Sequence, residues 1–400
     1  MFSRPLALLR RPFALLAILA FIVTLICYRQ VAKNHSYLTA PWTGNASKQE
    51  VPPLEYLPDF SPGVPKPPGS HYSRALIIPR LQKVDVSWIS SQVRDVQQFV
   101  YVVDDPSAPL HPPVNKGNEA MVYLTFLIDH YDNLPDIMIF MHSHSNSWHN
   151  EEPLGFQAAE LINRLSSERV TRDGYMNLRC NWGPGCPDWL HPGTDKVDPS
   201  KKEEVSLAKA WKEIFPFVEV PTVLSQACCA QFAVSRERAR AIPRASYIFY
   251  RDWLLRTELK SSISGRVWEY LWQVVFTGKN VFCPAQHTCY CDGYGLCFGG
   301  EKGMDEYFKL VRERRRGERE LNKWKKLGKV IQEAIEKGLS DDEIQKMEKP
   351  EPGRDAVLER EIEDKRQKLA MIVEKAKERG KDPRIRAEEA GREWKEGDGF

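Results

Sequence analysis

The sequence has little excess charge of either sign. It contains 57 Lys and Arg residues against 54 Asp and Glu residues, which leaves a net charge of +3 over 400 residues. A basic stripe interleaved with aromatic residues, the pattern typical of nucleic-acid-binding domains, is missing from the middle of the chain. The composition therefore gives no support to nucleic-acid binding.

Internal repeats are also missing, but hydrophobic residues are not scarce. They make up 42% of the chain, which excludes disorder throughout and supports the core of one large domain or two ordinary ones.

One long hydrophobic run is present near the start. Residues 12–28 are uncharged and apolar, and three arginines precede them, Arg4, Arg10 and Arg11. Such a run nearly spans a bilayer as a helix, and the arginines should stay cytoplasmic. We therefore predict a cytoplasmic tip and signal-anchor helix in residues 1–33, in a secretory-pathway membrane of the Golgi or endoplasmic reticulum. A cleaved signal peptide, and thus a secreted protein, is the alternative, although no small-x-small cleavage pattern follows the run.

Two glycosylation triplets, at Asn34 and Asn45, agree with a luminal chain. The cysteines also indicate a luminal chain. Cys27 lies in the apolar run, and the other eight, an even number, predict up to four disulfides. They are Cys180, Cys186, Cys228, Cys229, Cys283, Cys289, Cys291 and Cys297.

Zinc is the alternative for the last four cysteines, but their spacings contain no CxxC pair. A loop around residues 174–192 should be braced through Cys180 and Cys186. We expect the neighbouring Cys228 and Cys229 to pair with different loops, because adjacent residues rarely permit disulfide geometry.

Composition divides the rest of the chain into three parts. Residues 34–73 are rich in Pro and Gly and predict a stalk. Residues 74–300 predict a luminal α/β domain that closes with a compact cysteine-rich loop. Residues 301–400 are rich in Lys, Arg, Glu and Asp, and predict solvated helix plus disorder outside the core. A coiled coil is the alternative for this tail, but it lacks sustained apolar heptads.

The local patterns in residues 74–144 predict a parallel βαβ unit. The β-branched and aromatic runs 74–81 and 86–90 predict strands, as does the apolar run that ends at Val103. Helical spacing predicts a helix over about 118–131, and residues 136–144 predict the next strand. Farther along, we expect helices over 154–168, 206–215 and 264–278, and over 221–255 a strand followed by helical segments that Pro243 interrupts.

Polar residues follow two of these strands. Asp104 and Asp105 end one strand, and His142, His144 and His149 follow another. Ligands bind beyond the carboxyl ends of strands in open α/β sheets. If the strand continues, His142 and His144 share a face and can hold a divalent ion. An ordinary turn is the alternative for both groups.

Asn115, Lys116 and Glu119 precede the helix at about residue 118, where backbone amides and an ammonium group can bind phosphate. A plain helix start capped by Asn118 is the alternative.

Trp148 beside His149 predicts a sugar-stacking platform, although a tryptophan is more often core. Glu269 lies in an apolar segment, where an ionised carboxylate is costly unless it is paired or catalytic. Arg266 is the candidate ion-pair partner, and the alternative role is a general base.

Four ordered blocks resemble an uncharacterised family, domain of unknown function 3431. They begin "VNKGNEAMVYL", "GYMNLRC", "CCAQFAVS" and "SGRVWEYLW", and the likeness spans roughly residues 74–300. The same pattern looks like remote relatives of glycosyltransferases of the A fold, which implies a Rossmann-like mixed sheet with flanking helices. The chain departs from that second pattern at His142-Ser143-His144, which stands where an acidic DxD metal site is expected, so the metal is a histidine-ligated ion or is absent.

The resemblance implies a type II membrane enzyme that transfers a sugar from a nucleotide sugar to a glycan or glycolipid. Asp104, Asp105, Asn115, Lys116 and Glu119 would hold the donor, and Trp148 and His149 the sugar. His142 and His144 would bind Mn or Zn, and Glu269 would take the acceptor proton. The alternatives are a metal-dependent hydrolase that uses the histidines, and a non-catalytic, disulfide-braced glycan-binding or scaffold protein.

Overall fold

The computed structural model describes residues 60–400. The predicted membrane anchor and most of the predicted stalk lie outside the described residues. Within the described part, no helix combines the length and the apolar character needed to cross a bilayer.

A five-stranded mixed sheet forms the centre of the domain, in the order β2-β1-β3-β6-β4. β1, β2 and β3 are parallel, and β6 runs antiparallel to both β3 and β4. The strands are β1 (Arg74–Arg80), β2 (Gln97–Val102), β3 (Ile137–Phe140), β4 (Tyr175–Asn177) and β6 (Phe232–Ser235). A separate pair joins β5 (Ser225–Gln226) to β7 (Val281–Phe282). The predicted mixed α/β fold is confirmed.

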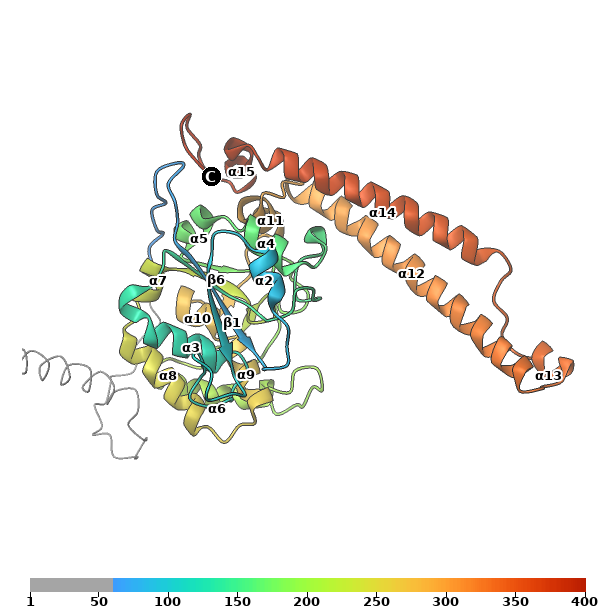
Figure 1. Ribbon diagram of the computed structural model, residues 1–400, viewed down its shortest axis with the longest axis horizontal. Coiled ribbons are helices and arrows are strands. Elements are labelled where there is room, and N and C mark those ends of the chain that lie inside the picture. Colours follow the sequence, from blue (N-terminus) through green and yellow to red (C-terminus); the bar gives the residue numbers. More distant parts are fainter. Residues whose placement is uncertain (1–59) are drawn as a thin grey trace, which may run out of the picture. The chain divides into compact units, whose positions relative to one another are not determined.

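Helices cover both faces of the sheet (Figure 1). Ala75 and Ile77 of β1 face one core, and Leu76 and Ile78 face the other, as the two-residue period of a strand requires. The first core is built with α3 (Ala120–Asp129), α6 (Glu204–Ile214), α7 (Arg236–Arg240), α8 (Arg244–Arg256), α9 (Ser261–Glu269) and α10 (Trp272–Thr277). The second is built with α2 (Ser87–Gln92), α4 (Ala158–Arg164), α5 (Ser167–Asp173), α11 (Gln286–Tyr294), α12 (Gly300–Glu336) and α14 (Arg354–Arg379).

Three local predictions need correction. Residues 87–90 lie in α2 and not in a strand, and Val86 directly precedes this helix. The Asp85 carboxylate accepts hydrogen bonds from the amide and hydroxyl of Ser87, and this turn leads into the helix. The expected cysteine-rich loop contains α11, whose residues from Cys289 to Tyr294 are all buried, so no amphipathic period marks it. The single helix expected over 264–278 is two, α9 and α10, with a break after Glu269.

The charged tail differs from the expected mixture of solvated helix and disorder. α12 and α14 pack antiparallel as a hairpin, with α13 (Asp341–Gln345) at its tip, and α15 (Pro383–Glu389) returns to α11 (Figure 1). Leu358, Ile362 and Leu369 of α14 are buried. These apolar side chains are too few to form a sustained heptad pattern in the sequence. They are sufficient, however, to pack one pair of helices against each other.

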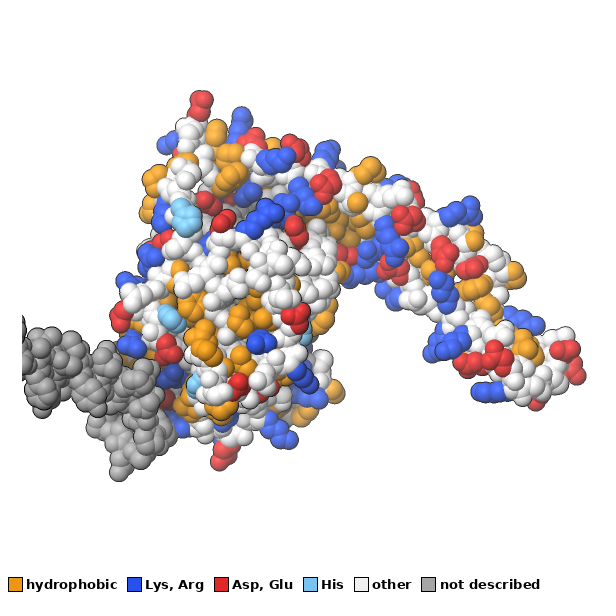
Figure 2. All heavy atoms as spheres, in the orientation of Figure 1, with side chains coloured by type: hydrophobic (Ala, Val, Ile, Leu, Met, Phe, Trp, Pro, Cys, Tyr) orange, Lys and Arg blue, Asp and Glu red, His pale blue; other side chains and the backbone are white. Residues whose placement is uncertain are grey.

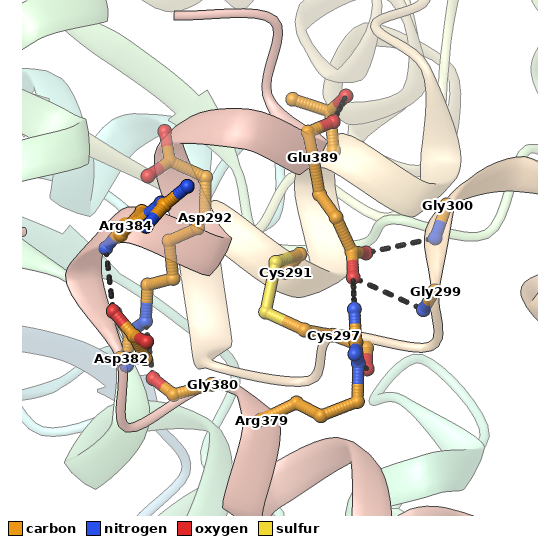
Figure 3. Close-up of a disulfide and its surroundings, with 12 residues drawn as sticks. Cys291, Asp292, Cys297, Gly299, Gly300, Arg379, Gly380, Asp382, Arg384 and Glu389 are labelled. Carbon is orange, nitrogen blue, oxygen red and sulfur yellow. Dashed lines mark hydrogen bonds and ion pairs between the residues drawn. A yellow bond between two sulfur atoms is a disulfide. The ribbon is translucent and has the colours of Figure 1, made fainter. Parts of the chain in front are cut away.

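The base of this hairpin is held beside the Cys291–Cys297 disulfide (Figure 3). The Glu389 carboxylate accepts hydrogen bonds from the amides of Gly299 (3.1 Å) and Gly300 (3.0 Å), where α12 begins. It also pairs with Arg379 at the end of α14 at 2.7 Å. One buried side chain of α15 thus connects both helices of the hairpin to the domain.

Residues 60–400 contain four disulfides, in agreement with the prediction of up to four. Cys180–Cys289 and Cys186–Cys283 attach the loop after β4 to the α11 region. The expectation for Cys228 and Cys229 is wrong, because they pair with each other. The chain turns sharply there, with positive φ at Cys229 and Ala230, and this local backbone brings the neighbouring sulfur atoms together.

Candidate functional site

The candidate site lies where β3 ends and β6 begins. Phe140 of β3 pairs with Phe232 of β6, so the residues after β3 run beside those before β6. The His142 amide donates to Gln231 Oε1 at 3.2 Å, which ties the two segments together. We call this region the β3–β6 edge.

The histidines do not share a strand face, because β3 ends at Phe140. His144 is exposed, whereas His142 is partly buried and meets His149, with 3.3 Å between their Nδ1 atoms. Ser147 Oγ lies 3.0 Å from His149 Nδ1. Burial lowers the pKa of His142 to about 3 and that of His149 to about 4. Both imidazoles are therefore neutral at neutral pH and able to donate, accept or bind a metal.

Trp148 presents an exposed ring next to this pair. Its side chain is 58% exposed, and its ring centroid lies 4.2 Å from that of His149. The Arg179 guanidinium stands 5.4 Å from the Trp148 ring and donates to the carbonyl oxygens of Trp148 (2.8 Å) and His149 (3.2 Å). An aromatic platform with polar neighbours is thus fixed at the surface.

Glu269, the last residue of α9, contacts the segment that precedes β6. Its Oε1 accepts a hydrogen bond from the Cys229 amide at 2.6 Å. Arg266, the ion-pair partner considered from the sequence, pairs with Glu203 instead at 3.3 Å. Burial raises the pKa of Glu269 to about 7, and the Glu203 charge adds to this, against the opposing effects of the Cys229 amide and Arg266.

Glu119 is the second carboxyl group here. Burial and the Glu269 charge raise the pKa of Glu119 to about 8. A close contact explains why the two groups interact: a Cβ on Gly265 of α9 would lie 2.4 Å from Asn118 Nδ2. Glu269 lies one helical turn beyond Gly265 on the same face. The start of α3 and the end of α9 are therefore pressed together.

Comparison with known proteins identifies a family but no individual relative. Residues 76–292, more than half of the chain, match the family described as "Protein of unknown function (DUF3431)". The chain belongs to this family. No curated protein and no solved structure matches it. The family resemblance is thereby confirmed, while the likeness to A-fold glycosyltransferases has no support from these comparisons. The DUF3431 match contains every candidate site residue from Asp104 to Glu269.

The aspartates lie at the same sheet edge but are engaged in turns. Asp104 accepts a hydrogen bond from the Gln82 amide at 2.7 Å. Asp105 accepts hydrogen bonds from the amide (2.9 Å) and hydroxyl (2.6 Å) of Ser107, which lower the pKa of Asp105. β1 lies between their strand and that of His142. The turn alternative accounts for these contacts.

The three residues predicted to bind phosphate have different surroundings in the structure. Lys116 Nζ donates to the carbonyl oxygens of Leu255 (3.3 Å) and Thr257, at the end of α8. A lysine at this position satisfies carbonyls that the helix leaves without partners. Asn115 is exposed. Glu119 is the member of this group that joins the β3–β6 edge.

The predicted metal ligands His142 and His144 are not brought into a three-ligand cluster. In residues 60–400, groups of three ligand atoms within 4.8 Å of one another occur at Cys228/Cys229/Glu269 and Cys291/Cys297/Glu389. Their cysteines form disulfides. His142 still fits a ligand role in one respect, because its buried Nε2 has no hydrogen-bond partner within the described residues.

Sequence reasoning missed Glu151 and Arg179. Glu151 is buried, and its carboxylate accepts hydrogen bonds from the Asn181 amide (3.2 Å), the Cys180 amide and the Tyr290 hydroxyl. Burial raises the pKa of Glu151. It joins the segment after β3 to the loop after β4 and to α11. The only sequence signal for Glu151 was its position directly after the histidine cluster. A charged residue at such a position is also common in ordinary polar turns.

Proposed function

We propose that this DUF3431-family protein is a glycosyltransferase that moves a sugar from a nucleotide sugar to a hydroxyl of a glycan or glycolipid. The observation that carries the proposal is Glu269, a partly buried carboxyl group at the β3–β6 edge whose pKa is raised to about 7. A general base works best when its pKa lies near the working pH.

In the proposed reaction, Glu269 accepts the proton of the acceptor hydroxyl. The acceptor oxygen forms a bond to the anomeric carbon of the sugar, and the bond from that carbon to the diphosphate oxygen breaks. The nucleoside diphosphate leaves with the electron pair. Burial, and to a smaller extent the charge of Glu203, raise the pKa of Glu269, so this base can take up and release a proton near neutral pH.

Trp148 and His149 form the proposed sugar platform. The exposed indole offers an apolar face to a sugar ring, while Arg179 fixes the backbone on which it stands. Asp104, Asp105 and Asn115 remain candidates for the donor. Lys116 is a weaker one because the α8 carbonyls occupy its ammonium group.

A divalent ion, Mn or Zn, is part of the proposal as a partner of the donor diphosphate. His142 and His149 fit it because both are neutral, and His142 Nε2 is available. When bound, such an ion offsets phosphate charge. The same pair of imidazoles favours a second candidate, a metal-dependent hydrolase, in which the ion activates water.

The proposed location is the lumen of the secretory pathway, with the protein held by residues 1–33. Four disulfides support it, since disulfides persist in oxidising compartments.

The test combines binding and turnover. Purified protein is screened by thermal shift and by a transfer assay against nucleotide sugars, with and without Mn²⁺ or Zn²⁺. Glu269→Gln should lower kcat by about 10²–10⁴-fold, and the wild-type rate should rise with pH to a plateau above about pH 7 because the base must be ionised. The control is Glu258→Gln, an exposed carboxyl on the chain that precedes α9.

Three results decide between the candidates. Silence across the nucleotide-sugar panel would contradict the transferase. Hydrolysis that needs a tightly held Zn²⁺ would favour the hydrolase. Glycan binding that is lost in Trp148→Ala but kept in Glu269→Gln, with no turnover, would favour the non-catalytic protein.

A further inference from the structure

α12 carries a row of basic side chains that the β3–β6 edge does not use. The row consists of Lys309, Arg312, Arg316, Arg319, Lys323 and Lys326, and all six are exposed. We call it the α12 basic row. Figure 2 shows Lys and Arg side chains recurring along the hairpin arm among Asp and Glu side chains.

The spacing of the row places it along one side of the helix. Successive members are three or four residues apart, which is the spacing of neighbours on a helix surface. At about 1.5 Å per residue, the row is about 25 Å long. It therefore forms a straight line of positive charge.

Most members of the row form no ion pair within the described part of the chain. Lys323 pairs with Glu348 at 3.0 Å, whereas within residues 60–400 the other five members have no ion-pair partner. Like charges three or four residues apart destabilise a helix by about 0.2–0.5 kcal/mol per pair. A bound polyanion would relieve this repulsion.

Acidic side chains beside the row limit the shape of a partner that can bind there. Glu313 and Glu320 lie three or four residues from members of the row, so they border it along one side of the helix. A flat anionic bilayer that reached the row would also approach these acidic side chains. A thin, linear polyanion can lie along the row and avoid them.

We propose that the α12 basic row binds a linear anionic polysaccharide that carries sulfate or carboxylate groups. The proposal is independent of the transferase proposal, because it concerns a surface on the hairpin arm and needs no catalysis. Binding rests on charge and should therefore weaken as salt rises.

The experiment measures binding of the full-length chain to immobilised heparin, with uncharged dextran as the blank. The test variant is Lys309→Glu/Arg312→Glu/Arg316→Glu/Arg319→Glu. The control variant, Lys83→Glu/Lys202→Glu/Lys212→Glu/Lys279→Glu, makes the same change in net charge at exposed lysines outside the hairpin.

Wild type and control should bind heparin with affinities within a few-fold of each other, and the test variant should bind about tenfold more weakly or worse. In wild type, heparin should also protect Lys309, Lys323 and Lys326 from acetylation, which tests the row even if the test variant misfolds. Equal losses in both variants, no wild-type binding to heparin, or binding to anionic but not zwitterionic vesicles in place of heparin would each overturn the proposal.

Discussion

Glu119 and Glu269 are carboxyl groups that the fold keeps close together, and neither forms an ion pair within residues 60–400. Each has a pKa raised from the ordinary value of 4.5, to about 8 and about 7 respectively, with burial as the main cause. At the scale of single residues, this carboxyl pair is the feature that a plain helix start at Asn118 would not explain.

The pair makes stability depend on pH. Between pH 4.5 and about pH 8 the folded state keeps protons that the unfolded state loses, so the free energy of unfolding falls as pH rises through this window. Glu119→Gln should remove part of this slope. We expect the variant to match wild type at pH 4.5 or below and to exceed it at pH 8, in urea denaturation at both values. A variant that is less stable than wild type at pH 8 would show that the Glu119 charge is stabilised in the fold.

At the scale of elements, close backbone contacts decide how helices meet. Gly380 ends α14 where the chain passes Gly295 at the end of α11, and a Cβ there would lie 2.0 Å from the Gly295 carbonyl oxygen. Both positions belong to helix ends, so neither shows a pattern that predicts the contact.

Gly380→Ala should therefore destabilise the protein by about 1–3 kcal/mol, the usual cost of overpacking. The matched control is Gly328→Ala, inside α12, where a Cβ meets no atom within 4 Å. That change should stabilise the helix by up to about 1 kcal/mol, because alanine has the higher helix propensity. Thermal unfolding followed by circular dichroism compares the two, and equal effects would refute the contact.

At the scale of the whole molecule, disulfides hold together segments that are distant in sequence. Cys180–Cys289 closes a separation of 109 residues, whereas Cys291–Cys297 closes one of 6. Both pairs are buried, so their replacement by alanine leaves comparable cavities.

Loop-closure entropy then predicts unequal costs. Because Cys186–Cys283 stays intact and already joins the same segments, Cys180–Cys289 closes a loop of only about 14 residues. Its removal should lower the free energy of unfolding by about 3 kcal/mol, and removal of Cys291–Cys297 should lower it by about 2 kcal/mol. Denaturant titration of the two double-alanine variants measures the difference. If the short loop proves the costlier one, local packing around α11 outweighs chain entropy.

The central sheet was largely predictable because its signals are local. The βαβ order follows from the β-branched run in residues 74–81, the helical period in residues 118–131 and the apolar run before His142. Residues 86–90 were assigned to the wrong element because β-branched and aromatic residues also suit a short helix when a turn at Asp85 and Ser87 begins it. α11 carried no usable signal, since burial on all sides removes periodicity.

The candidate site was predictable in its residues but not in its contacts. The residue types marked His142, Trp148 and Glu269 as unusual in their surroundings. Their partners could not be predicted, since His149, Arg179 and Cys229 approach them from turns whose path depends on the whole fold.

The sequence by itself determined the mixed α/β class, the even set of disulfide-forming cysteines and the helical character of the charged tail, because composition and short-range period encode these properties. Only the tertiary structure decided that Arg266 forms its ion pair with Glu203 and not with Glu269, that Cys228 pairs with Cys229, and that the tail returns to the domain. The reason is physical. Ion pairs, disulfides and helix docking depend on distances between residues far apart in the chain, and those distances exist only once the core has formed.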